Sequence, residues 1–323
     1  MSMPALFNGR LSIPVIGAPL FIVSVPDLVI AQCKAGVVGS FPALNARPPE
    51  LLDEWLGRIK QELAAYDKAN PDRPSAPFAV NQIVHRSNDR FEQDMTVCAK
   101  WKVPIVITSL GARVELNEAV HSWGGITLHD VIDDRFARKA VEKGADGIIA
   151  VAAGAGGHAG RWSPFALVQE IRAWFDGPLI LSGAIANGGA VLAAQAAGAD
   201  LAYVGSPFIA TAEANASDAY KQGIVEGGAA DIIYSDLFTG VHGNYLRASV
   251  VAAGLDPDNL AAGNLDTMKF GGGADGGSKA KAWKDIWGSG QGIGAVDRVC
   301  PAAEYIDRLA EQYAAAKARL SAS

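Results

Sequence analysis

Two stretches of the chain share one pattern: Lys143-Gly144-Ala145-Asp146-Gly147-Ile148-Ile149-Ala150-Val151 and Ala197-Gly198-Ala199-Asp200-Leu201-Ala202-Tyr203-Val204. In each stretch a glycine closes a helical segment, Ala-Asp follows, and a short apolar run comes next. A glycine at a helix end is typical of the loop that leads from a helix into the next strand. The recurrence of this pattern indicates consecutive βα units.

Apolar runs alternate with amphipathic stretches on both sides of these two segments. Candidate strands end near Ala18, Ser40, Gln82, Ser109, His129, Ala153, Ser182 and Ser206. Candidate helices between them include Pro49–Tyr66, Arg135–Lys143, Phe165–Trp174 and Ala190–Ala197. Strands that are apolar on both faces and alternate with helices predict a parallel sheet covered on both sides.

Eight such units predict an α/β fold of the (β/α)8 TIM-barrel type over residues 1–225. An open Rossmann sheet is the alternative, but no Gly-x-Gly-x-x-Gly follows the first strand. Residues 226–323 are expected to form an irregular cap or lid and a closing helix that returns to the barrel. This part contains the glycine-rich run Phe270–Gly277 and, at Ala302–Ala316, an amphipathic pattern with Tyr305, Leu309 and Tyr313 on one face.

The amino-acid composition and the net charge argue against several classes of protein. Half of the 323 residues are hydrophobic and 19% are charged, which excludes a disordered chain. The net charge is −6 and no basic tract stands out, so nucleic acid is not an expected partner. Three cysteines lie far apart, and neither a signal peptide nor an apolar run long enough to span a membrane is visible. We expect a soluble cytoplasmic protein without a membrane anchor.

Small residues follow the last two strands of the predicted barrel, at Ser182-Gly183-Ala184 and Gly205-Ser206. Loops in this place frequently bind a phosphate in barrels of this class, since backbone N–H groups and helix N-termini attract an anion. Tight turns without a ligand would have the same composition. No Walker-type sequence is present, so a phosphate of a resident cofactor or a sugar phosphate is favoured over ATP.

His158 is the candidate for catalysis. It lies in a flexible, glycine-rich segment after strand six, Ala153-Gly154-Ala155-Gly156-Gly157-His158. A neutral imidazole near its ordinary pKa of about 6.5 suits a general base at neutral pH. His129 ends strand five and is expected to face the same barrel mouth. No spacing of histidines or acidic residues indicates a metal site.

Six motifs in this order resemble the nitronate monooxygenase family, also called the 2-nitropropane dioxygenase-like family of FMN-dependent barrels. The motifs are Gly17-Ala18-Pro19-Leu20, Val80-Asn81, Ala155-Gly156-Gly157-His158, Ser182-Gly183-Ala184, Val204-Gly205-Ser206-Pro207-Phe208 and Ile286-Trp287-Gly288-Ser289-Gly290-Gln291-Gly292. Relatives more often carry Met at the position of Leu20 and Gly at that of Ala184.

The resemblance implies noncovalent FMN at the barrel mouth. Its phosphate would bind backbone N–H groups of Gly183, Ala184, Gly205 and Ser206. The turn Ala18-Pro19-Leu20, together with Asn81 and Gln291, would contact the isoalloxazine. Further cofactor-binding residues would be Ser109, His129, Ala153, Gly157 and Ser182. His158 matches the family's active-site histidine, which is implied to deprotonate a nitroalkane or to orient a nitronate.

The activity implied is oxidation of alkyl nitronates or nitroalkanes with O2 to carbonyl compounds and nitrite. Relatives on this fold also include NAD(P)H-dependent FMN reductases of quinones and enoyl thioesters, and the sequence does not separate the two activities. A phosphosugar isomerase or aldolase would use the same phosphate site without flavin. A binding module without turnover would leave His158 without a purpose. The aromatic C-terminal part could cover a substrate or a second subunit, which leaves a homodimer open.

Overall fold

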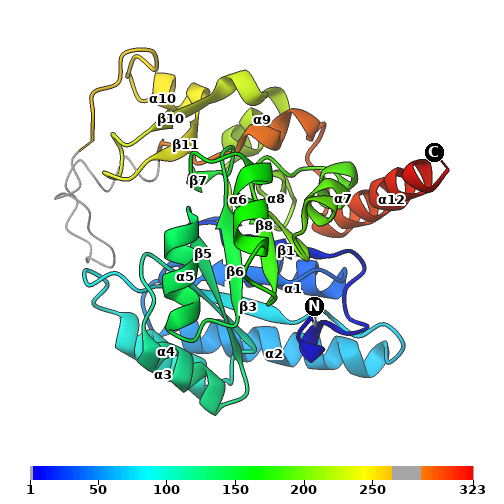
Figure 1. Cartoon of the computed structure of the whole chain (residues 1–323). Helices are drawn as coiled ribbons and strands as arrows, with labels where there is room; N and C mark the ends of the chain where they lie inside the picture. The colour runs from blue at the N-terminus through cyan, green and yellow to red at the C-terminus, as the bar shows by residue number, and fades with distance from the viewer. Residues whose placement is uncertain (1–2, 264–284, 323) are drawn as a thin grey trace.

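The computed structural model describes residues 3–263 and 285–322 (Figure 1). Eight strands form one sheet in the order β1-β9-β8-β6-β5-β4-β3-β2, and all of its neighbouring pairs are parallel. The strands are β1 (Val15–Gly17), β2 (Gly39–Pro42), β3 (Phe78–Ile83), β4 (Ile105–Ser109), β5 (Ile126–Val131), β6 (Gly147–Val151), β8 (Leu179–Ser182) and β9 (Leu201–Val204). Each predicted strand end lies within two residues of the observed one.

The sheet closes on itself between β1 and β2. Ile16 and Val38 form a parallel bridge there, and the N–H of Gly17 donates to the Val38 carbonyl at 2.7 Å. The N–H of Val38 in turn donates to the Val15 carbonyl at 3.2 Å. These bonds make the sheet a (β/α)8 barrel, as the sequence predicts, and exclude the open Rossmann alternative.

Helices cover the outside of the barrel. They are α1 (Pro26–Lys34), α2 (Leu51–Ala69), α3 (Phe91–Lys100), α4 (Val114–Ser122), α5 (Asp134–Glu142), α6 (Pro164–Arg172), α7 (Gly188–Ala197) and α12 (Ala302–Ser321). Their first turns explain where several begin: Pro26 and Pro164 open α1 and α6, while Asp133 and Asn187 cap α5 and α7 through their side chains.

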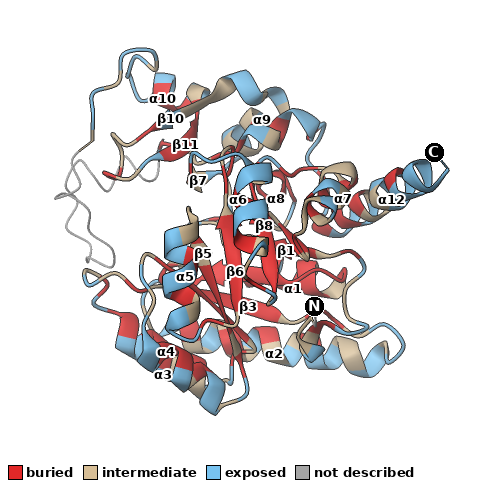
Figure 2. Cartoon of the chain, in the orientation of Figure 1, coloured by how far each residue is buried: buried red, intermediate tan, exposed pale blue. Residues whose placement is uncertain are grey.

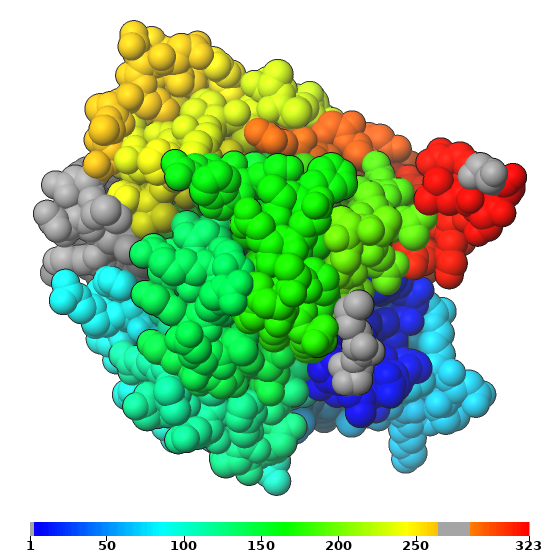
Figure 3. All heavy atoms as spheres, in the orientation of Figure 1, coloured from blue at the N-terminus to red at the C-terminus, as the bar shows by residue number. Residues whose placement is uncertain are grey.

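The closing helix α12 takes the last place in the outer ring, between α7 and α1. The Tyr305 hydroxyl donates to the Ala186 carbonyl at 3.0 Å, and the N–H of Gly188 donates to Gln312 Oε1 at 3.0 Å. A Cβ on Gly188 would collide with the α12 backbone, so this glycine permits the close approach. The C-terminal turns of α12 project from the body of the molecule (Figures 1 and 3).

The barrel interior is filled by one apolar layer to which every strand contributes. Its members are Ile16, Val38, Ala79, Ile105, Ile107, Leu128, Ile149, Ile180 and Leu201, together with Phe7 below them. Figure 2 shows the barrel strands mostly buried, while the surrounding helices alternate buried and exposed residues along their length. Larger clusters between strands and helices complete the core.

A cap stands over the carboxyl ends of the strands. It contains α9 (Asp218–Glu226), α10 (Arg247–Ala252) and a three-stranded antiparallel sheet, and it is inserted between β9 and α12. The sheet consists of β10 (Ile232–Ser235), β11 (Gly243–Leu246) and β7 (Gly157–His158), which follows β6 of the barrel. The space-filling view shows the cap residues, yellow and orange, directly against the green middle of the chain (Figure 3).

The predicted division at residue 225 therefore separates parts that share a sheet, because β7 pairs with β11. The glycine-rich run Phe270–Gly277 lies outside the described residues. Among the helices within 3–263 and 285–322, none is both long and apolar enough to cross a membrane.

Candidate active site

A polar layer lies directly above the apolar layer of the barrel interior. Side chains alternate between the two faces of a strand, so the residue two positions after an interior residue also points inward. Counting from the apolar layer, the next inward positions are Ala18, Ser40, Asn81, Ser109, Asp130, Val151, Ser182 and Tyr203. Ala18, Asn81, Ser109 and Ser182 are sequence-predicted site residues, and the structure brings them to this one layer.

Three of these residues form a chain of hydrogen bonds across neighbouring strands. Asn81 Nδ2 on β3 donates to Ser109 Oγ on β4 at 2.7 Å, and Ser109 Oγ donates to Asp130 Oδ2 on β5 at 2.5 Å. Burial raises the pKa of the Asp130 carboxyl to about 6, against the opposing effect of the Ser109 hydrogen bond. Burial and the charge of Asp130 also raise the pKa of Tyr203, so Tyr203 stays neutral near pH 7.

His129 does not face the barrel mouth, contrary to the expectation from sequence. Its neighbours Leu128 and Asp130 both point inward, so its own side chain points outward to the helix layer. There its Nδ1 lies 2.5 Å from Thr108 Oγ1, another outward residue, and the ring is buried. Burial first, then the charge of Lys143, lowers its pKa to about 4. The sequence interpretation missed the register of β5 by one residue, and Asp130 stands where His129 was expected.

Glycines pack the opposite side of the mouth. A Cβ on Gly183 would lie 2.8 Å from the Ala153 carbonyl oxygen, and one on Gly290 would lie 2.6 Å from that of Gly154. The N–H of Gln291 donates to the Gly154 carbonyl at 2.9 Å. The C-terminal segment thus returns to the turns after β6 and β8, since a Cβ on Gly292 would also lie 2.7 Å from the Ala184 carbonyl oxygen, while the expected contact of Gln291 with the isoalloxazine stays a prediction.

The two turns predicted to bind phosphate follow the neighbouring strands β8 and β9, but one of the N–H groups expected to bind phosphate, that of Ala184, is not available. Gly183 and Ala184 both have positive φ, 143° and 54°, although Ala184 carries a Cβ. The N–H of Ala184 donates to the Gly154 carbonyl at 3.2 Å and is therefore already engaged. Ser206 Oγ accepts from the N–H of Gly290 at 2.8 Å, and its own proton is left for another acceptor.

The N-terminus of α7 is not an anion site, although the sequence interpretation gave helix N-termini this role. Asn187 caps it by accepting from the N–H of Ala190 at 2.8 Å, and Gln312 of α12 accepts from Gly188. Two of the N–H groups at this helix start, those of Gly188 and Ala190, are thus satisfied within the protein and are not available to a phosphate. The turn at Gly183 and the start of α8 (Ser206–Ile209) remain as the candidate anion contacts.

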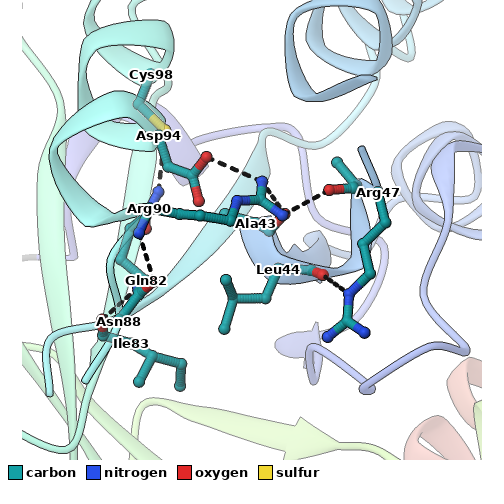
Figure 4. A network of polar contacts seen from close by, with 10 residues as sticks. Ala43, Leu44, Arg47, Gln82, Ile83, Asn88, Arg90, Asp94 and Cys98 are labelled. Carbon is teal, nitrogen blue, oxygen red and sulfur yellow. Dashed lines mark hydrogen bonds and ion pairs between the residues drawn. The ribbon is translucent and has the colours of Figure 1, made fainter. Parts of the chain in front are cut away.

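A buried ion pair secures the loop after β2 (Figure 4), and a residue of this loop contacts the predicted isoalloxazine turn Ala18-Pro19-Leu20. Arg90 Nη2 donates to Asp94 Oδ1 at 3.0 Å, and Nη1 donates to the Ala46 carbonyl at 2.7 Å. From the same loop, Asn45 Nδ2 donates to the Leu20 carbonyl at 2.9 Å. On its other side this turn meets the phosphate side, because a Cβ on Gly205 would contact Leu20 and Ala18.

His158 stands in the cap sheet, where β7 pairs it with Gly243. The sequence interpretation took this segment as flexible; the structure makes it a strand. His158 Nε2 lies 3.1 Å from Thr239 Oγ1, which donates its proton to the Val241 carbonyl at 2.8 Å. In that arrangement Nε2 donates to Thr239 and the imidazole lone pair is on Nδ1. Burial lowers the pKa of His158 to about 4, so the ring is neutral at pH 7.

Sequence reasoning missed Asp130, Tyr203 and the Arg90–Asp94 pair. Asp130 and Tyr203 could have been found by counting two residues beyond Leu128 and Leu201, once the inward face of each strand was fixed. The Arg90–Asp94 pair has helical i, i+4 spacing and gave no other signal. Among the described residues, no group of three or more His, Cys, Asp and Glu side chains is arranged to hold a metal ion.

Several known proteins are similar to this chain over most of its length. A nitronate monooxygenase of Paraburkholderia phytofirmans is 26% identical over 295 residues, which cover 76% of each chain. The (3aS,4S,5R,7aS)-5-hydroxy-7a-methyl-1-oxo-octahydro-1H-indene-4-carboxyl-CoA dehydrogenase of Rhodococcus jostii is 24% identical over 238 residues, covering 74% of this chain and 64% of that protein. A nitroalkane oxidase structure from Streptomyces ansochromogenes shares the fold, with a TM-score of 0.79, 22% identity, and coverage of 98% of this chain and 100% of that one.

The family model described as nitronate monooxygenase matches residues 9–312, which is most of the chain. The family consists of flavin-dependent oxidoreductases, which act on small molecules with oxygen. This chain is therefore an oxidoreductase, and it belongs to the nitronate monooxygenase family.

Proposed function

We propose that the enzyme uses FMN to oxidise alkyl nitronates, or the parent nitroalkanes, with O2 to carbonyl compounds and nitrite. The family match and the relative from Paraburkholderia phytofirmans support this reaction class. The observation that carries the proposal is a half-buried, neutral imidazole, His158, on the cap strand that follows β6 at the barrel mouth, next to turns that suit a flavin phosphate.

The residues present fit FMN. The turn at Gly183 and the start of α8 would present backbone groups and the Ser206 hydroxyl to the phosphate, whereas the Ala184 N–H already donates to the Gly154 carbonyl. Gly183 leaves no room for a larger side chain. The residues that we propose for cofactor binding are Ala18, Pro19, Leu20, Asn81, Ser109, Ala153, Gly157, Ser182, Gly183, Ala184, Gly205, Ser206 and Gln291. When bound, FMN would take up electrons from the substrate and pass them to O2.

His158 would serve a nitronate better than a neutral nitroalkane. An imidazole with a pKa of about 4 is neutral at pH 7 but is a weaker base than an exposed histidine. A nitronate has already lost its proton, and its negative charge would raise the imidazole pKa and favour a bound proton. His158 would then hold and orient the anion, while Thr239 keeps the ring in place.

Replacement of His158 by Asn tests this role. General-base or orienting groups contribute about 10²–10⁴-fold, so turnover should fall by about that range while flavin stays bound. Equal losses with preformed nitronate and with nitroalkane indicate orientation, and a larger loss with nitroalkane indicates proton removal. His242→Asn is the matched control, since His242 is an exposed histidine stacked on Tyr234 in the same cap. Full activity of His158→Asn with both substrates would contradict the proposal.

The cofactor is tested separately. The purified protein should absorb in the flavin bands, and heat should release about one FMN per chain, identified by its mass. A colourless protein would contradict flavin dependence and return attention to a phosphosugar isomerase or aldolase. Release of FAD would keep the reaction class and change the cofactor.

NAD(P)H-dependent FMN reduction of enoyl thioesters or quinones is the second candidate. It is favoured by the relative from Rhodococcus jostii, whose name specifies a carboxyl-CoA substrate. Anaerobic mixing with NADH separates the two functions. Rapid bleaching of the flavin supports the reductase, and an unchanged flavin spectrum supports oxidation of nitronates by oxygen.

A further inference from the structure

The hydrogen bonds between Asn81, Ser109 and Asp130 have a fixed direction. An ionised carboxylate can only accept, so the single proton of Ser109 points to Asp130 Oδ2. Ser109 Oγ must then accept from Asn81 Nδ2, at 2.7 Å. Each bond in the chain thus depends on the one before it, beginning at Asp130.

The amide of Asn81 is fully determined by its partners. Its Nδ2 donates one hydrogen to Ser109 Oγ and the other to the Ile107 carbonyl at 3.2 Å. The Ile107 carbonyl can only accept, and Ser109 Oγ accepts here because Asp130 engages its proton, so both neighbours of the amide nitrogen hold this orientation. Both donors of Asn81 are used, and only Oδ1 can bind a ligand. This side of the mouth therefore offers acceptors and no amide or hydroxyl donor from Asn81 or Ser109.

An acceptor suits one atom of an oxidised isoalloxazine in particular. The ring system carries several acceptors, among them its carbonyl oxygens, but its only N–H donor is N3–H. We propose that Asp130 is a positioning residue, which acts through Ser109 to keep Asn81 as a pure acceptor for the flavin N3–H. The inference rests on the proposed FMN site and adds to it a residue outside the predicted set.

A purely structural role would not explain a carboxylate here. Asp130 lies in the barrel interior directly above Leu128 and beside the phenol of Tyr203. An apolar side chain would fill this position without removing a charge from water. The position of the charge, two hydrogen bonds from the Asn81 amide, is what an orienting role requires.

The test is a double-mutant cycle on flavin affinity. FMN release from the holoenzyme on dilution is followed by the recovery of flavin fluorescence for wild type, Asp130→Asn, Ser109→Ala and the double variant. Loss of one oriented hydrogen bond should weaken FMN binding roughly 5- to 30-fold in each single variant. Because Asp130 acts through Ser109, the double variant should bind FMN no more weakly than Ser109→Ala.

Thr108→Val is the matched control. Thr108 pairs with His129 on the outer face of the same two strands, in the same register as Ser109 with Asp130. This variant should keep wild-type FMN affinity. Midpoints of thermal unfolding show whether a loss of affinity merely follows a loss of stability; we expect Asp130→Asn to lose affinity without a lower midpoint.

Two results would overturn the proposal. Unchanged FMN affinity in Asp130→Asn would show that the carboxylate has no part in binding. Additive losses in the double variant would show that Asp130 acts independently of Ser109, by direct contact. A wild-type protein without flavin would overturn the proposed function itself, and the absorbance of the purified protein shows this before any variant is made.

Discussion

The two sides of the barrel mouth are built from different groups. On the β3–β5 side the polarity is that of side chains, since the buried Asn81 and Ser109 and the half-buried Asp130 are linked by hydrogen bonds. On the β8–β9 side the polarity is that of the backbone, and Gly183 and Gly290 bring main-chain segments together. A side-chain network can be altered by replacing one atom with another of similar size. A backbone junction tolerates no added atom, so the two sides should respond differently to substitution.

Gly183→Ala should have the largest effect. Its Cβ would lie 2.8 Å from the Ala153 carbonyl oxygen, at a φ of +143° that side chains rarely adopt. Strain and overpacking together should cost about 2–4 kcal/mol of unfolding free energy. The turn would also move away from the candidate phosphate site, so at least a tenfold loss of FMN affinity is expected. Urea unfolding and flavin fluorescence measure the two effects.

Gly124→Ala is the control for this comparison. Gly124 also has positive φ, +83°, but a Cβ there would meet nothing within 4 Å. Only the cost of the backbone conformation remains, about 1 kcal/mol, and FMN affinity should not change. Equal losses of stability in the two variants would show that backbone conformation, and not close packing, sets the tolerance of the glycine side.

Asp130→Asn should produce a smaller change of opposite sign. The pKa of Asp130 is raised to about 6 from an ordinary 3.8, so its ionisation costs more in the folded than in the unfolded protein. The contribution of Asp130 to the free energy of unfolding should therefore be most favourable below pH 4. It should fall as the pH rises through 6. Because the carboxyl is partly exposed, we expect Asn to add about 1–2 kcal/mol at pH 8.

Unfolding of the flavin-free protein at pH 4 and pH 8 measures this gain. The benefit of Asn should shrink towards pH 4, where both side chains are uncharged. Tyr203, the other titratable group beside Asp130, stays protonated throughout this range because its pKa is raised. A gain of the same size at both pH values would assign it to packing instead of charge. A loss at pH 8 would show that the carboxylate stabilises the barrel.

The difference between the side-chain side and the backbone side of the mouth also explains which features could be predicted from the sequence. The glycine side was visible because each tight turn leaves a short local pattern of small residues, such as Ser182-Gly183-Ala184, which indicates a turn although it does not identify a ligand. The strand count followed from the alternation of apolar runs and helical segments. Both kinds of signal depend on neighbours in the sequence, and the structure confirms the barrel that they predict.

The side-chain network could not be obtained in this way. His129 and Asp130 are adjacent, and which of them faces the interior depends on the register of β5 against β4. A shift of one residue exchanges the two faces, and each face of this short strand carries both apolar and polar residues. Likewise, the N-terminus of α7 looked available for an anion because Gln312, which occupies it, lies 124 residues further along the chain.

Gln291→Ala should have the smallest effect and concerns the boundary between the two sides. The backbone N–H of Gln291 holds the C-terminal segment to Gly154, and this bond does not depend on the side chain. The side chain itself is exposed, so unfolding free energy should change by less than about 0.5 kcal/mol. If its amide contacts the isoalloxazine, loss of the contact should shift the flavin reduction potential. It should also change kcat/KM by roughly 2- to 5-fold. Gln93→Ala, an exposed glutamine on α3, is the matched control and should leave both unchanged. Wild-type kinetics and potential in Gln291→Ala would show that the segment serves the site through its backbone alone.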